Sequence, residues 1–292
     1  MPSGAVLAEA LRPLPAGYHR LAARVVAAAE GDARIRALWL SGSLGRGVAD
    51  AGSDLDVVVA LEQAAFDDFA ATWRDWLAGI TPTLLARDLP RLPGSFYSVT
   101  AECLRLDVVA ERAGTASAGA LALRLLILDK DGRAGLTAAA IAAATARAAP
   151  AARAAAPVPD PAKLAELTEE FLRQLTIFPA AVVAREDWLL GVVGVQHIQM
   201  LLYQLFVESN QPLPPMGVKQ WSAKLTTGQR AVCAGLPSPA ASREAVLTAM
   251  RAAAAAFRQA ARDILAARQI PWPAGFDQAV RRYWLAELGW TE

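Results

Sequence analysis

Two hydrophobic periodicities divide the chain near residue 135. Before that point, short apolar runs of strand length alternate with stretches whose apolar residues recur every three or four positions. The pattern predicts strands over residues 34–42, 54–62, 95–111 (one or two strands) and 123–132. It predicts helices over residues 5–29, with an interruption at Pro13 and Pro15, and over residues 66–79. Interleaved strands and helices indicate an α/β or α+β domain around a mixed sheet.

After residue 162 every apolar pattern has helical spacing. The predicted helices cover residues 162–176, 185–209, 218–234, 241–268 and 275–288. Five helices joined by short loops predict a helical bundle. Residues 138–157 are nearly all alanine, which predicts a helix that leads into a proline-rich connector. We therefore expect a first domain over residues 1–137, a connector over 138–161 and a helical bundle over 162–292.

Apolar residues make up 54% of the 292 positions, so membrane-spanning segments have to be considered. The most apolar helical stretch, residues 188–208, contains Gln196, His197 and Gln199, whereas a spanning helix needs roughly 20 almost uninterrupted apolar residues. We expect a helix buried in a protein core, with His197 as a hydrogen-bonded core histidine, and no membrane partner. The N-terminus lacks the features of a signal peptide, so a cytoplasmic protein is expected.

Charge and cysteine content narrow the function classes further. A net charge of +1 gives no general attraction for nucleic acid, whose binding surfaces are strongly basic, although a small anion could bind in a local pocket. Cys103 and Cys233 are too few and too far apart for a disulfide framework or a zinc site. We expect both to be buried thiols.

Residues 42–60, GSLGRGVADAGSDLDVVVA, place two acids one position apart inside an apolar run. Side chains alternate along a strand, so Asp54 and Asp56 point the same way while Leu55 and Val57 face the core. Two carboxylates this close raise each other's pKa unless a cation lies between them. Paired hard oxygen ligands are what magnesium prefers, so the pair predicts a divalent metal.

The preceding residues predict an anion site beside that metal. Gly42 and Ser43 end a predicted strand, and Gly45 and Gly47 permit a tight turn in which backbone N–H groups can converge on a phosphate. A helical turn that began at Ser43 would also direct its N-terminus at that phosphate. Phosphate and metal would then share one pocket.

The stretch GSLGRGVADAGSDLDVVV resembles the signature of the polymerase-beta-type nucleotidyltransferase superfamily, a Gly-Ser followed by a spaced Asp-x-Asp. A sheet domain followed by a helical bundle is similar to the bacterial aminoglycoside adenylyltransferases and their lincosamide-modifying relatives. The resemblance covers residues 34–135, and the C-terminal half agrees mainly in its helical character. It implies an α+β fold: a catalytic domain with a mixed sheet flanked by helices, then an all-α bundle that binds the acceptor.

The resemblance also implies roles for particular residues. Gly42 and Ser43 would hold the phosphates of ATP, and Asp54 and Asp56 would hold magnesium, with two ions as the usual arrangement. The family has a third carboxylate on a later strand, which Asp107 in LRLDVVA supplies. It would be either the general base for the acceptor hydroxyl or chiefly a metal ligand. The nearby alternative, Glu102, is better explained as a surface residue of a hairpin.

Two basic residues are candidates for binding the nucleotide. Arg46 in the glycine turn could contact a phosphate with its planar guanidinium, or it could simply be solvated. Lys219 comes just after a proline-glycine loop, and it resembles a lysine from a comparable helical segment with which distant relatives hold the triphosphate. The alternative for Lys219 is a solvated helix end.

Residues 185–191, REDWLLG, are the candidate acceptor contacts. Glu186, Asp187 and Trp188 combine acids with an aromatic ring, which suits ion pairing and stacking with a polyamino sugar. The same residues also fit a first helical turn whose acids complement the helix dipole, with a core tryptophan.

These features predict a magnesium-dependent enzyme that transfers AMP from ATP to a hydroxyl of a small molecule, chiefly an aminoglycoside-type antibiotic, and so confers resistance. The alternatives are a protein-modifying adenylyltransferase of the antitoxin type and a catalytically silent nucleotide-binding sensor. A nucleic-acid polymerase is disfavoured by the neutral charge balance. We expect a monomer or a homodimer.

Overall fold

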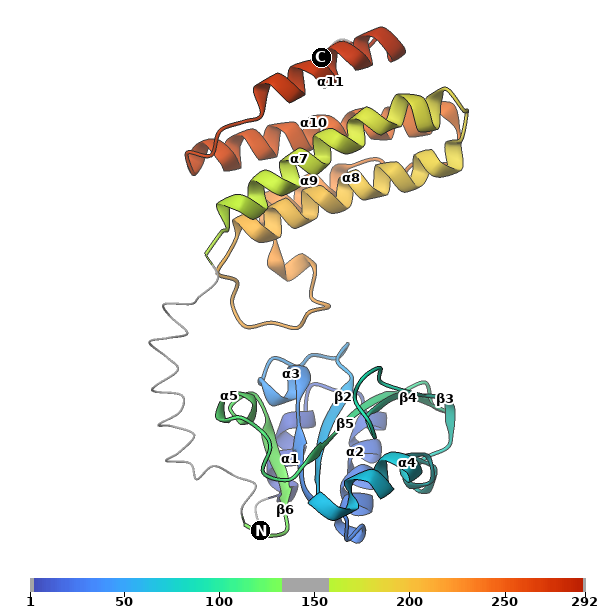
Figure 1. Cartoon of the computed structure of the whole chain (residues 1–292), viewed down its shortest axis with the longest axis vertical. Coiled ribbons are helices and arrows are strands. Elements are labelled where there is room, and N and C mark those ends of the chain that lie inside the picture. Colours follow the sequence, from blue (N-terminus) through green and yellow to red (C-terminus); the bar gives the residue numbers. More distant parts are fainter. Residues whose placement is uncertain (1–2, 133–157, 291–292) are drawn as a thin grey trace. The chain divides into compact units, whose positions relative to one another are not determined.

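The computed structural model describes residues 3–132 and 158–290, which belong to two compact units (Figure 1). The first unit comprises Met1–Ala154 together with Pro214–Lys219, and the second comprises Ala155–Leu213 and Gln220–Glu292. The alanine-rich helix predicted over residues 138–157 lies outside the described residues.

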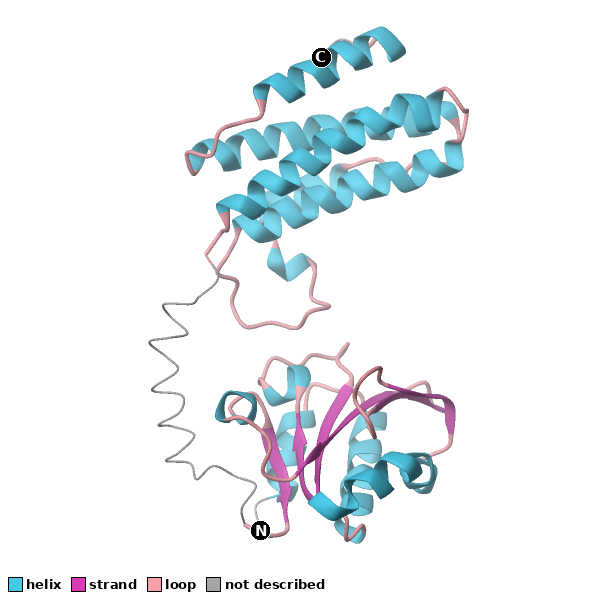
Figure 2. Ribbon diagram, in the orientation of Figure 1, coloured by secondary structure: helices cyan, strands magenta, loops and turns pink. Residues whose placement is uncertain are grey.

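The first unit is built on one mixed sheet, whose strands are magenta in Figure 2. The sheet has six strands in the order β3-β4-β5-β2-β1-β6. The strands are β1 (Ile35–Leu40), β2 (Leu55–Leu61), β3 (Thr83–Asp88), β4 (Phe96–Thr100), β5 (Arg105–Arg112) and β6 (Leu125–Asp129). β2 and β5 pair in parallel, and the other neighbours pair antiparallel. With the helices that flank it and the helical C-terminal region, this sheet confirms the predicted α+β fold class.

The two faces of the sheet differ in what covers them. Leu55, Val57 and Val59 of β2 enter the main core, which also contains residues of α1 (Ser3–Leu11), α2 (Ala16–Gly31) and α4 (Phe66–Ile80). Val58 and Ala60 belong to a small separate cluster with Trp39 on the opposite face. Because side chains alternate along a strand, Asp56 lies on the face of Val58, away from the main core.

The region 95–111 forms two strands, β4 and β5, as the sequence pattern allowed. Cys103 in the turn between them differs from expectation, because it is exposed, at a φ of 59°. The expectation of a buried Cys103 was wrong because a hairpin turn faces solvent. β3, an edge strand with mostly exposed residues, was not predicted, since it lacks apolar alternation. The short helix α5 (Ala118–Leu121) was also missed, whereas α3 (Gly42–Gly45) is the helical turn considered at Ser43 and begins one residue earlier.

The second unit is helical. Its elements are α7 (Pro161–Phe178), the π-helical turn η2 (Pro179–Val183), α8 (Trp188–Ser209), the 3-10 turn η3 (Ser222–Lys224), α9 (Thr227–Gly235), α10 (Arg243–Ala267) and α11 (Ala274–Leu288). α8 packs against α7 and α10, and the rings of Phe171 and Phe257 stack at 3.9 Å in the core. The helix predicted from residue 218 begins only at Thr227, because a capping box between Thr226 and Gln229 fixes its first turn there.

α8 is less buried than the sequence suggested. The side chain of His197 is 46% exposed and its Nε2 lies 3.7 Å from Glu170 Oε1, so the expected core histidine was wrong. The helix packs on α7 and α10 but leaves Leu189, Val193 and Met200 exposed. Cys233 is half-buried, and burial raises the pKa of its thiol.

The length and apolarity of α8 are those of a membrane-crossing helix, with a mean hydropathy of 1.4 over its most apolar window. Within the described ranges it is the one helix with these properties, and 39% of that window is buried inside the protein. The core helix of a bundle has the same composition, so this feature is weak evidence for a membrane span.

Candidate active site

Three aspartates lie on the less covered face of the sheet, at one end of two neighbouring strands. Asp56 of β2 is the register partner of Asp107 of β5, and parallel neighbours in register carry their side chains on the same face. Asp54 immediately precedes β2, and its side chain is 17% exposed. The local Asp-x-Asp spacing and the pairing of two strands therefore gather three carboxylates in one place.

The electrostatics of the three aspartates show that they interact. Burial, together with the charges of Asp54 and Asp107, raises the pKa of Asp56 to about 6. Burial and the charge of Asp54 also raise the pKa of Asp107. The pKa of Asp54 responds in the opposite direction: burial alone would raise it, but a hydrogen bond from Lys219 and the charge of Arg105 bring it below its usual value. Carboxylates that repel each other in this way favour a cation among them.

Gly42 is fitted directly against Asp56. Its φ is +58°, and a Cβ placed on it would lie 1.8 Å from Asp56 Oδ2, so only glycine leaves room for that carboxylate. The backbone N–H of Ser41 donates to the carbonyl oxygen of Asp56 over 2.9 Å, which fixes the start of α3 beside β2. The Gly-Ser of the sequence pattern is thus packed on the acidic pair.

The rest of the turn between β1 and β2 is held by local hydrogen bonds. Val48 N–H donates to the carbonyl oxygen of Ser43 over 3.0 Å, and Gly52 N–H donates to Asp50 Oδ1 over 2.9 Å. Arg46 follows α3, and its charge acts to lower the pKa of Asp56. Gly42, Ser43 and Arg46 therefore lie in one short segment next to the carboxylates.

Two cations contact Asp54. Lys219 Nζ lies 2.7 Å from Asp54 Oδ2, within the first unit, to which the segment Pro214–Lys219 belongs. Arg105 NH1 lies 3.5 Å from the same oxygen, and Arg105 NH2 donates to the carbonyl oxygen of Gly52 over 3.2 Å. Sequence reasoning missed Arg105, although its position two residues before Asp107 on the same strand was a signal that both side chains share a face.

The donor set fits a divalent metal, because three carboxylates are hard oxygen ligands and Gly42 leaves space at Asp56. In the part of the chain that the structure describes, no group of three or more His, Cys, Asp or Glu side chains converges closely enough to hold a metal ion. Asp54 directs its Oδ2 at two cations instead, Lys219 Nζ at 2.7 Å and Arg105 NH1 at 3.5 Å.

Two of the three predicted acceptor residues, Asp187 and Trp188, have structural contacts of their own. Asp187 is the N-cap of α8 and accepts a hydrogen bond from Leu190 N–H over 3.0 Å. Glu186 has a φ of 53°, and Trp188 packs in part against the helical core, with Arg243 5.7 Å from its ring centroid. Glu102 lies between β4 and β5, where Arg20 approaches it at 3.3 Å. An acceptor contact at Glu186, Asp187 and Trp188 stays a prediction.

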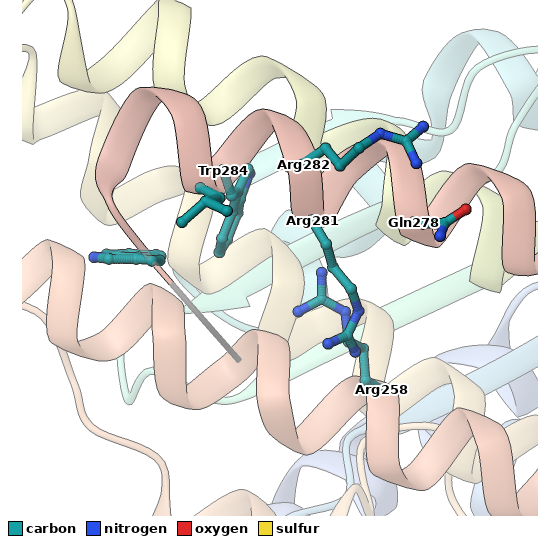
Figure 3. A pocket seen from close by; sticks show the side chains of 7 residues that line it. Arg258, Gln278, Arg281, Arg282 and Trp284 are labelled. Carbon is teal, nitrogen blue, oxygen red and sulfur yellow. The ribbon is translucent and has the colours of Figure 1, made fainter.

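The helical unit contains a cavity of about 210 Å³ at α11. Arg258 and Arg281 line it, and their side chains point toward one another (Figure 3). The buried carboxylate of Asp277 accepts from Arg258 Nε at 3.0 Å and from Arg262 NH2 at 2.9 Å, so it connects α11 with α10. None of the predicted site residues lines this cavity. We assign the charge cluster to packing of the two helices.

The likenesses that comparisons with known proteins give lie among solved structures. No protein-family model and no curated protein sequence matches the chain. Among solved structures, the chain is similar to an aminoglycoside 6-adenyltransferase from Bacillus subtilis, with 13% sequence identity and a TM-score of 0.39. The match covers 89% of this chain and 95% of that chain.

Proposed function

We propose that this protein is a magnesium-dependent nucleotidyltransferase that transfers AMP from ATP to a hydroxyl group of a small molecule, chiefly an aminoglycoside-type antibiotic. The observation that carries the proposal is the register pairing of Asp56 with Asp107, with Asp54 on the same face and Gly42 packed on Asp56. A sheet end with three carboxylates beside a glycine turn is suited to holding a metal and a phosphate chain together.

Each residue of the site has a role in the proposal. Asp54, Asp56 and Asp107 would hold magnesium, which when bound neutralises charge on the triphosphate and on the departing pyrophosphate. Gly42 and Ser43 would offer backbone N–H groups to the phosphates, and Arg46 would contact them with its guanidinium.

Asp107 is our candidate for the general base. It would accept the proton of the acceptor hydroxyl as that oxygen bonds to the α-phosphorus and pyrophosphate leaves. Burial and the charge of Asp54 raise its pKa, which makes its carboxylate a better proton acceptor at neutral pH than an ordinary aspartate. A positioned carboxylate base contributes about 100-fold to 10,000-fold in rate.

The acceptor class rests on the resemblance of a sheet domain followed by a helical bundle to the bacterial aminoglycoside adenylyltransferases. An aminoglycoside carries several ammonium groups, and Glu186 and Asp187 are acids that could pair with them, beside the ring of Trp188. Because Asp187 already caps α8, its share in binding an acceptor would be smaller than that of Glu186.

The test is transfer itself. The purified protein is incubated with magnesium, labelled ATP and a panel of aminoglycosides and lincosamides, and pyrophosphate release and the AMP-modified product are measured. We expect Asp107→Asn to lose at least 100-fold in rate while its fold is retained. Asp75→Asn, an exposed acid of α4, is the matched control and should keep full activity.

The same assay separates the alternatives. If ATP binds and the label is transferred to a protein but to no small molecule, the acceptor is a protein side chain. ATP binding without any transfer would indicate a silent sensor. Absence of both ATP and magnesium binding would refute the proposed function.

A further inference from the structure

The contact between Lys219 and Asp54 joins residues 165 positions apart in the sequence. Lys219 Nζ is 2.7 Å from Asp54 Oδ2, and the lysine side chain is 57% exposed while that of Asp54 is 17% exposed. The flanking residues, up to Leu213 and from Gln220, belong to the helical unit, but Pro214–Lys219 belongs to the sheet unit. The lysine is therefore brought to this carboxylate by a loop and not by the sheet itself.

The ammonium group of Lys219 lies where a metal ion bound to Asp54 Oδ2 would have to lie. A carboxylate oxygen that holds an ammonium at hydrogen-bond distance cannot also bind magnesium at about 2.0–2.1 Å without bringing two cations together. Asp54 Oδ2 is also 3.5 Å from Arg105 NH1, so the negative charge of Asp54 already interacts with two cations.

The formal charges of the site balance without a metal. Three carboxylates, Asp54, Asp56 and Asp107, face the positive charges of Arg46, Arg105 and Lys219. A divalent ion that entered alone would leave the site with surplus positive charge. A divalent ion that enters with a nucleoside triphosphate brings more negative charge than positive, and its phosphates give Lys219 a new partner.

We propose that Lys219 makes metal binding conditional on nucleotide: it holds Asp54 when the site contains no nucleotide, and it moves to the triphosphate when a metal–nucleotide complex enters. This inference rests on the proposed function, since it concerns the same site. Its consequence is a positive coupling between the two ligands, each of which strengthens binding of the other.

The test measures binding, not activity. Mn²⁺ binding to the full chain is measured by electron paramagnetic resonance, with and without a non-hydrolysable ATP analogue. For the unsubstituted protein we expect the analogue to strengthen Mn²⁺ binding by about tenfold or more, within the usual range of coupling between sites. In Lys219→Met, which removes the charge and keeps the length, Mn²⁺ alone should bind about tenfold more tightly, and the coupling should fall below about threefold.

Two further variants make the result specific. Lys219→Arg retains the charge and should retain the coupling. Lys224→Met, in the 3-10 turn η3, removes a charge nearby in the sequence and should leave both affinities unchanged. Lys219 is more than half exposed, so its substitution is not expected to prevent folding.

The outcomes distinguish this inference from the function on which it rests. If Mn²⁺ and the analogue bind but Lys219→Met binds Mn²⁺ alone no better than the unsubstituted protein, the inference is wrong and the proposed function stands. If neither ligand binds to any variant, both are wrong.

Discussion

Replacing Gly42 by alanine tests whether the glycine turn shapes the acidic site. The alanine would adopt a φ of +58°, which costs about 1–2 kcal/mol for a residue with a Cβ. Its Cβ would also lie 1.8 Å from Asp56 Oδ2, so the carboxylate has to turn away. An off-rotamer side chain costs about 0.5–1.5 kcal/mol, which brings the expected loss to roughly 1.5–3.5 kcal/mol.

The same turn offers a matched control. Gly47 has a φ of +67°, but a Cβ there meets nothing within 4 Å. Gly47→Ala should therefore incur the backbone cost of about 1–2 kcal/mol alone. The difference between the two variants isolates the displacement of Asp56.

The assay is thermal unfolding of both variants, followed by binding of Mn²⁺ with a non-hydrolysable ATP analogue. We expect Gly42→Ala to have the lower Tm and to bind the metal–nucleotide pair at least about tenfold more weakly, which is about 1.4 kcal/mol. Gly47→Ala should bind within about threefold of the unsubstituted protein. Equal stability and equal binding in the two variants would refute the argument that Gly42 is required by its contact with Asp56.

Three other predictions concern single carboxylates. Because the pKa of Asp56 is raised to about 6, its protonated form stabilises the folded state below pH 4 and that stabilisation is lost as the pH rises through 6. Without metal, Asp56→Asn should thus be more stable than the unsubstituted protein by about 1–2 kcal/mol at pH 8 in urea unfolding. A lower stability of Asp56→Asn at pH 8 would contradict the inferred repulsion of Asp56 by Asp54 and Asp107. Asp277→Asn should destabilise the helical unit by about 3–5 kcal/mol, since it leaves Arg258 buried beside a neutral group; an unchanged Tm would count against this cluster. Asp187→Ala should cost about 0.5–2 kcal/mol through the lost cap, whereas Asp187→Asn should retain stability; a raised acceptor KM in Asp187→Asn would point to acceptor binding instead.

How much of the fold could be predicted depended on how local each signal is. β2 was predicted because a short run of apolar residues is typical of a buried strand, and the structure buries it almost throughout. The break between α1 and α2 was predicted because Pro13 and Pro15 interrupt the helical pattern. β3 was missed because an edge strand needs few apolar residues. His197 was wrongly placed in the core because the sequence of α8 does not show which of its sides the neighbouring helices cover.

The candidate site divides in the same way. The shared face of Asp54 and Asp56 follows from the alternation of side chains along a strand, because the two residues are two positions apart. The pairing of Asp56 with Asp107 depends on sheet order and register, and the sequence offered it only through a family resemblance. The contact of Gly42 with Asp56 and that of Lys219 with Asp54 are tertiary contacts for which the local sequence has no signal.

The most direct test of the proposed site is where a metal binds. Crystals soaked with Mn²⁺ and a non-hydrolysable ATP analogue would show manganese in an anomalous difference map. We predict a peak within bonding distance of Asp56 and Asp107, with the triphosphate over Gly42 and Ser43. A bound nucleotide elsewhere in the protein, with no anomalous peak at these aspartates, would contradict the account.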